Sequence, residues 1–256
     1  IALKLLTARP GNGEDRSLRE ARALASLDHP NVAQVHDVGQ DGATTYLAME
    51  LVDGPDLAEE LKREDLEVLD KLRLLLAAGR GLDAAHSAGI VHGDFKPANV
   101  WVGSGQVRVA DFGVSRARAT ADMDATMGDD EPAELRWGTA AYAAPELFEG
   151  APHDQSSDVY AFCVSVFEAL YGVRPFRRPT VRQLYCEKLW PVPIVPHPAL
   201  TPRLRRLLSN GLHPNPEARP QSLAPLLAEL ETITRKRRGP QLHMVVPFAI
   251  IGVVAL

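Results

Sequence analysis

The stretch of residues 91–113 limits the fold more than any other part of the chain, because it carries several polar groups on a short path. Asp94, Asn99 and Asp111 lie along it, and Lys96 stands between the first two. Carboxylate and amide oxygens beside a lysine suit a hard cation and phosphate oxygens. The stretch is therefore a candidate metal and phosphate site.

The second half of this stretch predicts a small β-hairpin. Apolar residues at 100–102 and 107–109 flank Gly103-Ser104-Gly105, a glycine-rich turn sequence. A hairpin folds the chain back on itself, so we expect Asp111 to return to the neighbourhood of the residues that precede the first strand.

The same stretch resembles the catalytic and magnesium loops of the eukaryotic-type protein kinases. His92-Gly93-Asp94 stands where that family has His-Arg-Asp, Asn99 follows five residues after the aspartate, and Asp111-Phe112-Gly113 matches the family's Asp-Phe-Gly. Lys96-Pro97 resembles the serine/threonine branch. The chain is thus similar to the eukaryotic-like (Hanks-type) serine/threonine kinases of bacteria. This implies an α+β, bilobal kinase fold with a small, incomplete β-rich lobe and a larger helical lobe.

The resemblance implies a role for each polar group. Asp94 would accept the substrate hydroxyl proton, Lys96 would steady the transferring phosphoryl group, and Thr139 would brace both. Asn99 and Asp111 would hold magnesium, so the implied cofactors are ATP and Mg²⁺. Two further residues of the stretch have structural roles in the family: His92 and Phe112.

Residues 1–49 are predicted to be part of the small lobe. The run 1–6 reads as a strand, and it resembles the family strand whose lysine, here Lys4, pairs with the nucleotide phosphates. A helix is predicted over about 15–27, where Glu20 matches the glutamate that holds that lysine. An ordinary surface lysine and a solvated glutamate are the alternatives. The family's glycine-rich loop is expected before Ile1, so the chain is expected to be a fragment.

Strands are predicted over 32–38 and 44–49, joined by a turn at 39–42. The hinge that follows would place Met49 as gatekeeper and turn the Glu50 carbonyl and Val52 amide toward adenine.

Two further residues are implied near the nucleotide. Asp56 could accept a ribose hydroxyl or cap a helix. Trp101 stands where the family has a leucine-sized residue under adenine, and it could either stack on the base or fill the pocket.

The hinge and helical lobe are predicted to span residues 50–232. Leucines and alanines at helical spacing predict a helix over about 66–88, and further helices are predicted to begin at Ser157 and over 180–189, 202–212 and 222–236. By resemblance Asp158 anchors the backbone near the catalytic loop, the alternative being a first-turn acid favourable to the helix dipole. Glu146, in the family's Ala-Pro-Glu, is expected to pair with Arg219.

The last residues predict a membrane connection. Residues 233–243 read as a basic juxtamembrane segment, and 244–256 contain no charged residue. That run is shorter than the roughly 20 residues a spanning helix needs, so we expect it to be the start of a transmembrane helix. Basic residues before an apolar run place the kinase domain in the cytoplasm, at the cell membrane, with a single span. A C-terminal helix docked on the domain is the alternative.

Composition limits the kinds of partner that the chain can bind. A net charge of −5 argues against a nucleic-acid partner. Cys163 and Cys186 form no metal or disulfide pattern, which is typical of a reducing compartment. The implied partners are a protein substrate bearing serine or threonine and a membrane; a homodimer is left open.

The predicted function is ATP-dependent phosphorylation of serine or threonine hydroxyls on proteins, in signal transduction. A pseudokinase that binds partners without phosphoryl transfer is the runner-up, and a kinase for small-molecule hydroxyls is a more distant reading. Gly93 replaces an arginine that grips a loop phosphate in many family members, so activation is predicted not to depend strongly on phosphorylation of Thr120 or Thr126.

Overall fold

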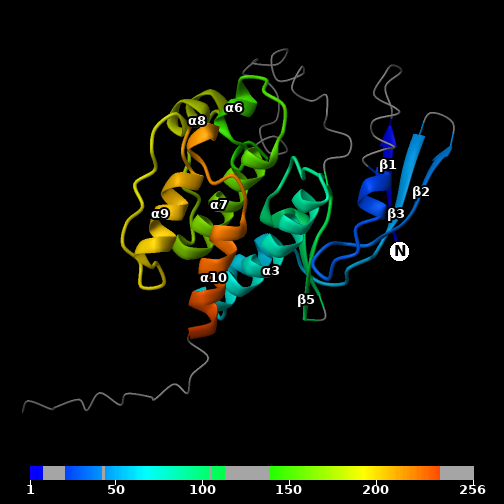
Figure 1. The fold of residues 1–256 in the computed structure, drawn as a ribbon, viewed down its shortest axis with the longest axis horizontal. Coiled ribbons are helices and arrows are strands. Elements are labelled where there is room, and N and C mark those ends of the chain that lie inside the picture. The colour runs from blue at the N-terminus through cyan, green and yellow to red at the C-terminus, as the bar shows by residue number, and fades with distance from the viewer. Residues whose placement is uncertain (8–20, 42–43, 104, 113–138, 237–256) are drawn as a thin grey trace, which may run out of the picture.

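The computed structural model describes residues 1–7, 21–41, 44–103, 105–112 and 139–236. The fold has two parts: a small sheet that begins at the N-terminus and a larger set of helices that follows it (Figure 1). This is the mixed helix-and-sheet kinase architecture that the motif order predicts, with the larger part helical.

The small part is a three-stranded antiparallel sheet. It consists of β1 (Ala2–Thr7), β2 (Val35–Asp41) and β3 (Thr44–Met49) in the order β1-β3-β2. β3 is central and alternates half-buried and buried positions, with Leu47 only 1% exposed. A short helical segment at 21–25, within the helix predicted over about 15–27, packs on the sheet through Ala21 and Leu24.

The sequence reading of β2 was wrong at both ends. The strand begins at Val35 rather than Val32, because Val32 instead forms an isolated parallel bridge with Val109. Gly39 lies within the ladder opposite Tyr46, not in a turn, and a Cβ at Gly39 would lie 2.2 Å from the Tyr46 ring. The glycine therefore makes room for a cross-strand aromatic ring. In the sequence, a glycine in this role looks the same as a glycine in a turn.

The larger part is a helical bundle. Its longest helices are α3 (Val68–Ser87), α7 (Gln155–Tyr171) and α10 (Ala224–Lys236), which pack together with α9 (Pro202–Gly211). The shorter helices are α2 (Leu57–Lys62), α6 (Pro145–Phe148) and α8 (Val181–Lys188), with 3₁₀ turns η1 (Pro97–Asn99) and η2 (Pro216–Ala218). Each long predicted helix is found within about two residues of its expected bounds.

Helix α7 is buried almost all round, which explains its near-continuous apolar sequence. It begins at Gln155, earlier than predicted, because Asp154 and Ser157 form a reciprocal capping box. Asp158 therefore lies in the first turn of α7, the place that the helix-dipole alternative gives it.

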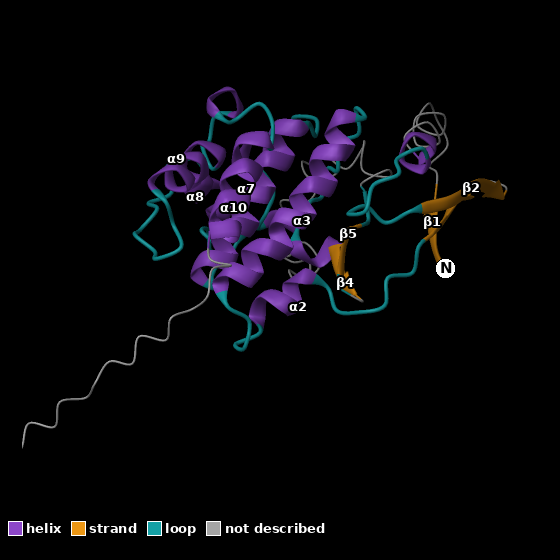
Figure 2. Ribbon diagram, turned by 60° about the horizontal axis from the view of Figure 1, so that its bottom comes forward, coloured by secondary structure: helices purple, strands orange, loops and turns teal. Residues whose placement is uncertain are grey.

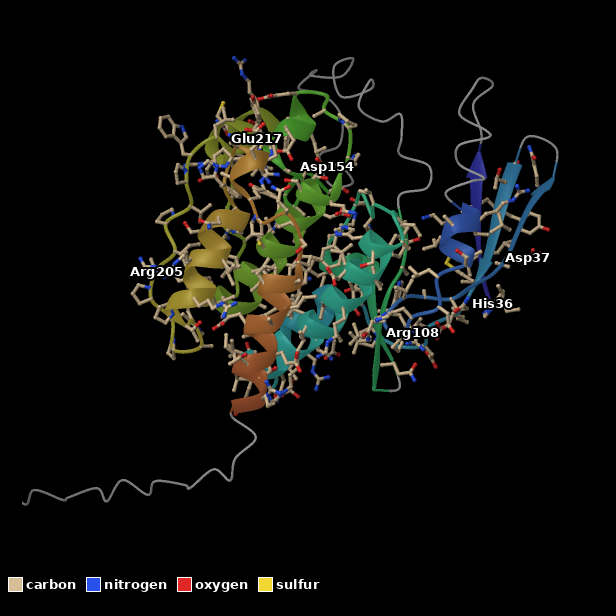
Figure 3. The ribbon with its side chains drawn as sticks, in the orientation of Figure 1. His36, Asp37, Arg108, Asp154, Arg205 and Glu217 are labelled. Carbon is tan, nitrogen blue, oxygen red and sulfur yellow. The ribbon has the colours of Figure 1, made fainter. Side chains whose placement is uncertain are left out.

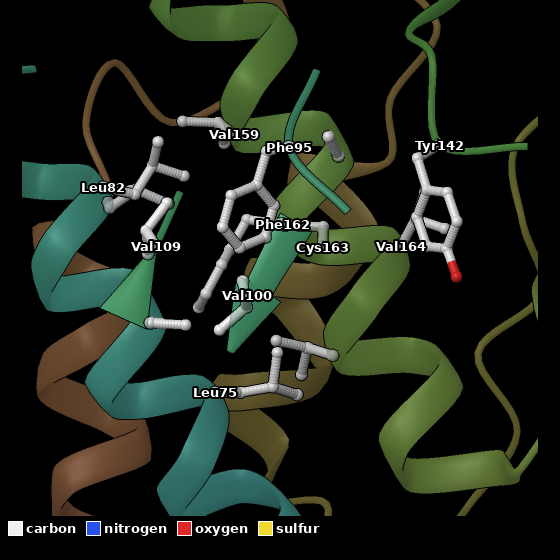
Figure 4. Packing of buried hydrophobic residues seen from close by; sticks show 14 of the residues in the cluster. Leu75, Leu82, Phe95, Val100, Val109, Tyr142, Val159, Phe162, Cys163 and Val164 are labelled. Atoms are coloured by element: carbon white, nitrogen blue, oxygen red, sulfur yellow. The ribbon is translucent and has the colours of Figure 1, made fainter. Parts of the chain in front are cut away.

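The predicted hairpin is present as β4 (Val100–Gly103) and β5 (Gln106–Val109). Figure 2 shows it at the edge of the helices, on the side of the small sheet. Its buried residues Val100 and Val109 join the central core around Phe95 and Phe162, whose rings are 5.8 Å apart (Figure 4). The core thus anchors the start and end of the segment that carries the polar groups.

No helix within the described part of the chain is long and apolar enough to cross a membrane. Helix α10 continues through Lys236, with Ile233 and Thr234 buried against the bundle. Residues 244–256, the predicted start of a transmembrane helix, lie outside the described residues.

Candidate active site

The catalytic-loop residues form one connected cluster. Lys96 Nζ lies 3.0 Å from Asp94 Oδ2 and donates to Thr139 Oγ1 at 2.9 Å. Asn99 Nδ2 donates to the Asp94 carbonyl at 2.8 Å and to Asp94 Oδ2 at 3.2 Å. The η1 turn places Asn99 under Asp94, since the Asn99 backbone N–H bonds the Lys96 carbonyl. Lys96 and Asn99 therefore meet at the Asp94 carboxylate, and Thr139, from a separate motif, joins the cluster through Lys96.

The backbone of the catalytic loop is held from below by a buried carboxylate. Asp158, 1% exposed, accepts from the His92 N–H at 2.8 Å and from the Gly93 N–H at 2.9 Å. His86 Nε2 lies 2.8 Å from the same carboxylate. Gly93 has φ +73°, and a Cβ there would meet nothing closer than the His153 ring at 3.5 Å. Conformation rather than space favours glycine at this position.

His92 connects the catalytic loop to the strand that leads to Asp111. Its Nε2 lies 3.0 Å from the Ala110 carbonyl, and its Nδ1 accepts from the Asp94 N–H at 3.2 Å. A neutral ring protonated on Nε2 satisfies both contacts, and burial lowers the pKa of His92. The Phe112 ring packs on the imidazole with centroids 4.6 Å apart. His92 and Phe112 therefore pack together between the catalytic loop and the strand that leads to Asp111.

Lys4 and Asp111 join the two parts of the molecule, and we call their end of the site the phosphate end after the role predicted for Lys4. Lys4 Nζ on β1 lies 3.0 Å from Asp111 Oδ1, and the two side chains are 30% and 44% exposed. Asp111 has φ +56°, the one positive value at a non-glycine among the described residues. Such backbone strain at a polar residue is typical of functional sites. Glu20, the predicted partner of Lys4, lies outside the described residues.

Asn99 and Asp111 fit magnesium by their chemistry. The Ala110 N–H bonds the Asn99 carbonyl at 2.9 Å, so the hairpin does return Asp111 to Asn99. The amide nitrogen of Asn99 is used on Asp94, which leaves its oxygen as the remaining side-chain ligand. No group of three or more acidic, histidine or cysteine ligands occurs within the described ranges. Two protein oxygens suit Mg²⁺, which keeps water and phosphate ligands.

The hinge residues run between the sheet and the hairpin. The Glu50 side chain accepts from Arg108 Nε at 3.0 Å and from the Gln34 N–H at 3.2 Å, which ties β5 to the small part. Met49 lines a small pocket together with Lys4 and Asp111. Val52 follows in the extended hinge and is half-buried.

Asp56 and Trp101 lie where the hinge meets the hairpin. Asp56 Oδ1 accepts from the Glu59 N–H at 2.8 Å, so it is the N-cap of α2, one of its two predicted alternatives. Asp56 also forms an isolated backbone bridge with Trp101, which pairs with Arg108 in the hairpin. Trp101 is half-buried. The ribose role of Asp56 and the two readings of the Trp101 ring stay predictions.

The loop that ends in Ala-Pro-Glu is fixed by charged groups. Glu146 and Arg219 form a bidentate pair with both N–O distances at 2.7 Å, as their motifs predict. Arg219 also donates to the carbonyls of His213 and Pro214, so the buried guanidinium is well satisfied.

Sequence reasoning missed three residues that support this site. Tyr142 donates to Glu168 on α7, His86 contacts Asp158, and Lys188 on α8 lies buried beneath the loop. Each is a polar residue on a buried helix face or in a short loop. The sequence feature that could have revealed them is a polar residue at helical spacing from apolar ones. Lys188, for example, lies four residues after buried Leu184 and so on the same face of its helix.

Comparison with known proteins identifies this arrangement. A family model described as "Protein kinase domain" matches residues 1–229. The serine/threonine-protein kinase PknA of Mycobacterium tuberculosis is 38% identical over 89% of this chain and 53% of its own length. The kinase pkn3 of Myxococcus xanthus is 35% identical over 87% of this chain and 42% of its own length. The chain therefore spans about half the length of these curated relatives.

A solved structure gives the same answer for the fold. The crystal structure of a point mutant of the Mycobacterium tuberculosis PknI kinase domain aligns with a TM-score of 0.62 and 26% identity. The alignment covers 90% of this chain and 83% of that one. The order of motifs, the assembled Asp94 cluster and these matches agree, and the chain belongs to the protein kinase domain family.

Proposed function

We propose that the protein transfers the γ-phosphoryl group of ATP to serine or threonine hydroxyls of a protein substrate. The single observation that carries this is the cluster at Asp94, whose carboxylate contacts Lys96 and Asn99, while Thr139 accepts a hydrogen bond from Lys96. A carboxylate held by Lys96 and Asn99 in a loop anchored from below is suited to orienting a hydroxyl and accepting its proton.

Each residue has a distinct task in this proposal. Asp94 orients the substrate hydroxyl, and Lys96, 3.0 Å away, offsets negative charge on the transferring group. Lys4 binds phosphate oxygens at the other end of the site. Asn99 and Asp111 would hold magnesium, which when bound neutralises charge on the phosphates. Catalysis then rests on positioning and charge stabilisation, with no covalent intermediate on the protein.

The same observation weighs against the pseudokinase alternative. A scaffold that only binds partners gains nothing from a buried network that orients one carboxylate. The proposal that the hydroxyl belongs to a protein is supported by the loop from Thr139 to Glu146, which matches the substrate-adjacent loop of the family, and by the names of the relatives.

The test is phosphoryl transfer from labelled ATP and magnesium to a generic basic protein by the native full-length protein. Asp94→Asn is expected to lower the rate by about 10²–10⁴-fold, the usual contribution of a positioned base. The matched control is Asp37→Asn, an exposed aspartate on β2 far from the site (Figure 3). Magnesium-dependent ATP binding by wild type with no transfer to any acceptor would instead support the scaffold.

We also propose that residues 244–256 belong to a single membrane-spanning helix that holds the kinase domain on the cytoplasmic side. The support is the sequence Arg235-Lys236-Arg237-Arg238 followed by an uncharged run from 244 to 256. The full-length protein is expected to stay in the membrane pellet after alkaline carbonate extraction. Deletion of 244–256 together with any apolar continuation should release the protein into the supernatant. Release of the undeleted full-length protein by carbonate would contradict the proposal.

A further inference from the structure

Lys188 is a fully buried lysine at the end of α8. Its side chain is 0% exposed, and Nζ donates to the Ala141 carbonyl at 2.9 Å and to the Ala143 carbonyl at 2.7 Å. The faces of Tyr160 and Phe176 lie 5.1 and 5.0 Å from Nζ. Both hydrogen bonds therefore go to the loop that precedes the Ala-Pro-Glu sequence.

This burial is costly, and packing alone does not explain it. Within the described residues, no carboxylate forms an ion pair with Lys188. Burial lowers the pKa of Lys188 well below its ordinary value, and the charges of Arg174 and Arg219 act in the same direction. A methionine or leucine would fill the aromatic space without this penalty. What lysine supplies, and an apolar residue cannot, is the pair of N–H donors.

The two carbonyls belong to a single turn that leads to the catalytic loop. The backbone N–H groups of Tyr142 and Ala143 both bond the Thr139 carbonyl at 3.1 Å. Thr139 Oγ1 in turn accepts from Lys96 Nζ at 2.9 Å, next to Asp94. A continuous path of hydrogen bonds thus runs from α8 through one turn to the catalytic lysine.

We infer that Lys188 is a positioning residue for phosphoryl transfer, which acts by fixing the turn 139–143 so that Thr139 meets Lys96. The inference rests on the proposed kinase activity. Removing the donors frees the Ala141 and Ala143 carbonyls, and the turn loses its support on the side away from the active site. The Thr139 hydroxyl then no longer has a fixed distance to Lys96, and Lys96 no longer has a fixed distance to Asp94.

A double-mutant cycle in the full-length protein tests this path. Lys188→Met keeps an unbranched side chain one heavy atom shorter than lysine and removes both donors, and Thr139→Ala removes the hydroxyl at the other end. Each single variant is expected to lower kcat about tenfold, because small misplacements of catalytic groups have large effects. KM for ATP should change less than about twofold. The double variant should be no more than about twofold slower than Thr139→Ala, since both changes break one path.

The control is Leu184→Ala, one turn earlier on α8. Leu184 is 1% exposed, so this change loosens the helix without removing the Lys188 donors. Its effect on kcat, if any, should multiply with that of Thr139→Ala. Should Lys188→Met fail to fold, Lys188→Gln, which keeps an N–H donor on a shorter arm, goes through the same cycle.

The outcomes separate the two proposals. Multiplicative effects of Lys188→Met and Thr139→Ala, or a wild-type kcat for Lys188→Met, would overturn the positioning role while leaving the kinase activity intact. The same non-additivity for Leu184→Ala would also overturn it, because the coupling would then report general loosening of α8. Absence of transfer by wild type would overturn the proposed function first, and the positioning role with it.

Discussion

The two ends of the site are built differently. At the buried end, the Asp158 carboxylate, 1% exposed, holds the backbone of the catalytic loop through the His92 and Gly93 N–H groups. At the phosphate end, Lys4 and Asp111 meet in one ion pair whose side chains are 30% and 44% exposed. The first end is a packed network, whereas the second is a single solvated contact between two parts of the molecule.

The difference teaches which part of the site is fixed before substrate arrives. A buried, fully paired carboxylate is costly to disturb, so the Asp94 loop is preorganised. A solvated ion pair contributes about 0–1 kcal/mol, so Lys4 and Asp111 can part with little loss of stability, as the proposed binding of phosphate and metal requires. Substitutions at the buried end should therefore reduce stability, and those at the phosphate end should reduce nucleotide binding.

The largest effect is expected at Asp158. Replacing it by alanine leaves the His92 and Gly93 N–H groups and the His86 ring nitrogen without their partner in a buried site. Loss of one member of a buried charged network costs roughly 3–5 kcal/mol. The free energy of unfolding, measured by urea denaturation, should fall by about that amount. A loss below about 1 kcal/mol would show that the buried end is not preorganised in this way.

At the phosphate end, Lys4→Met should act on ligand binding instead. We expect KM for ATP to rise by about tenfold or more, because the charge that faces the phosphates is removed. Its free energy of unfolding should change by less than about 1 kcal/mol. Steady-state kinetics with varied ATP and urea denaturation of the same preparation measure both. A large loss of stability with an unchanged KM for ATP would contradict the view that this end of the site serves nucleotide binding rather than stability.

The pH dependence of stability sharpens the comparison at His92. Burial lowers its pKa, so the folded state binds a proton less readily than the unfolded state. The contribution of neutral His92 to the free energy of unfolding is present above the unfolded pKa of about 6.5 and is lost as the pH falls below that value. The loss for one group is at most about 1.4 kcal/mol per pH unit. Urea denaturation between pH 7.5 and pH 5 should show this slope. His92→Gln should lower stability at neutral pH and flatten the slope, and an unchanged slope would contradict the assignment.

The smallest effect is expected from Thr120→Ala and Thr126→Ala. The Gly93 N–H is already fixed by Asp158, and Gly93 has no side chain to bind a loop phosphate. Turnover of each full-length variant should stay within about twofold of wild type. A large loss in either would mean that the buried end needs a loop phosphate after all. Both threonines lie outside the described residues, so the prediction rests on Gly93 alone.

The sequence predicts best those structural features whose local residue pattern is compatible with few other structures. The glycine-rich turn at 103–105 indicated the hairpin, because alternating apolar residues on both sides leave little else for it to form. The Glu146–Arg219 pair followed from two motifs that each need the other. Long apolar helices such as α7 were found from periodicity, with errors of about two residues at their ends.

The parts that it did not predict depend on contacts between distant segments. Gly39 looked like a turn residue because its sequence carries no sign of Tyr46 lying across the strand. The helix over 180–189 was predicted, but nothing in its sequence indicated that Lys188 is buried and donates to carbonyls of a loop more than 40 residues earlier. A local pattern cannot reveal a partner that only the folded chain brings near.

The most direct test of the central claim compares Asp111→Asn with Asp158→Ala in the full-length protein. Calorimetric titration with Mg-ATP and urea denaturation are carried out on both and on wild type. We predict that Asp111→Asn loses most magnesium-dependent affinity for ATP while its free energy of unfolding stays within about 1 kcal/mol of wild type. Asp158→Ala should show the opposite, a large loss of stability with ATP affinity largely kept by the folded fraction. Equal losses of affinity and stability in the two variants would contradict the division of the site into a fixed end and an adjustable one.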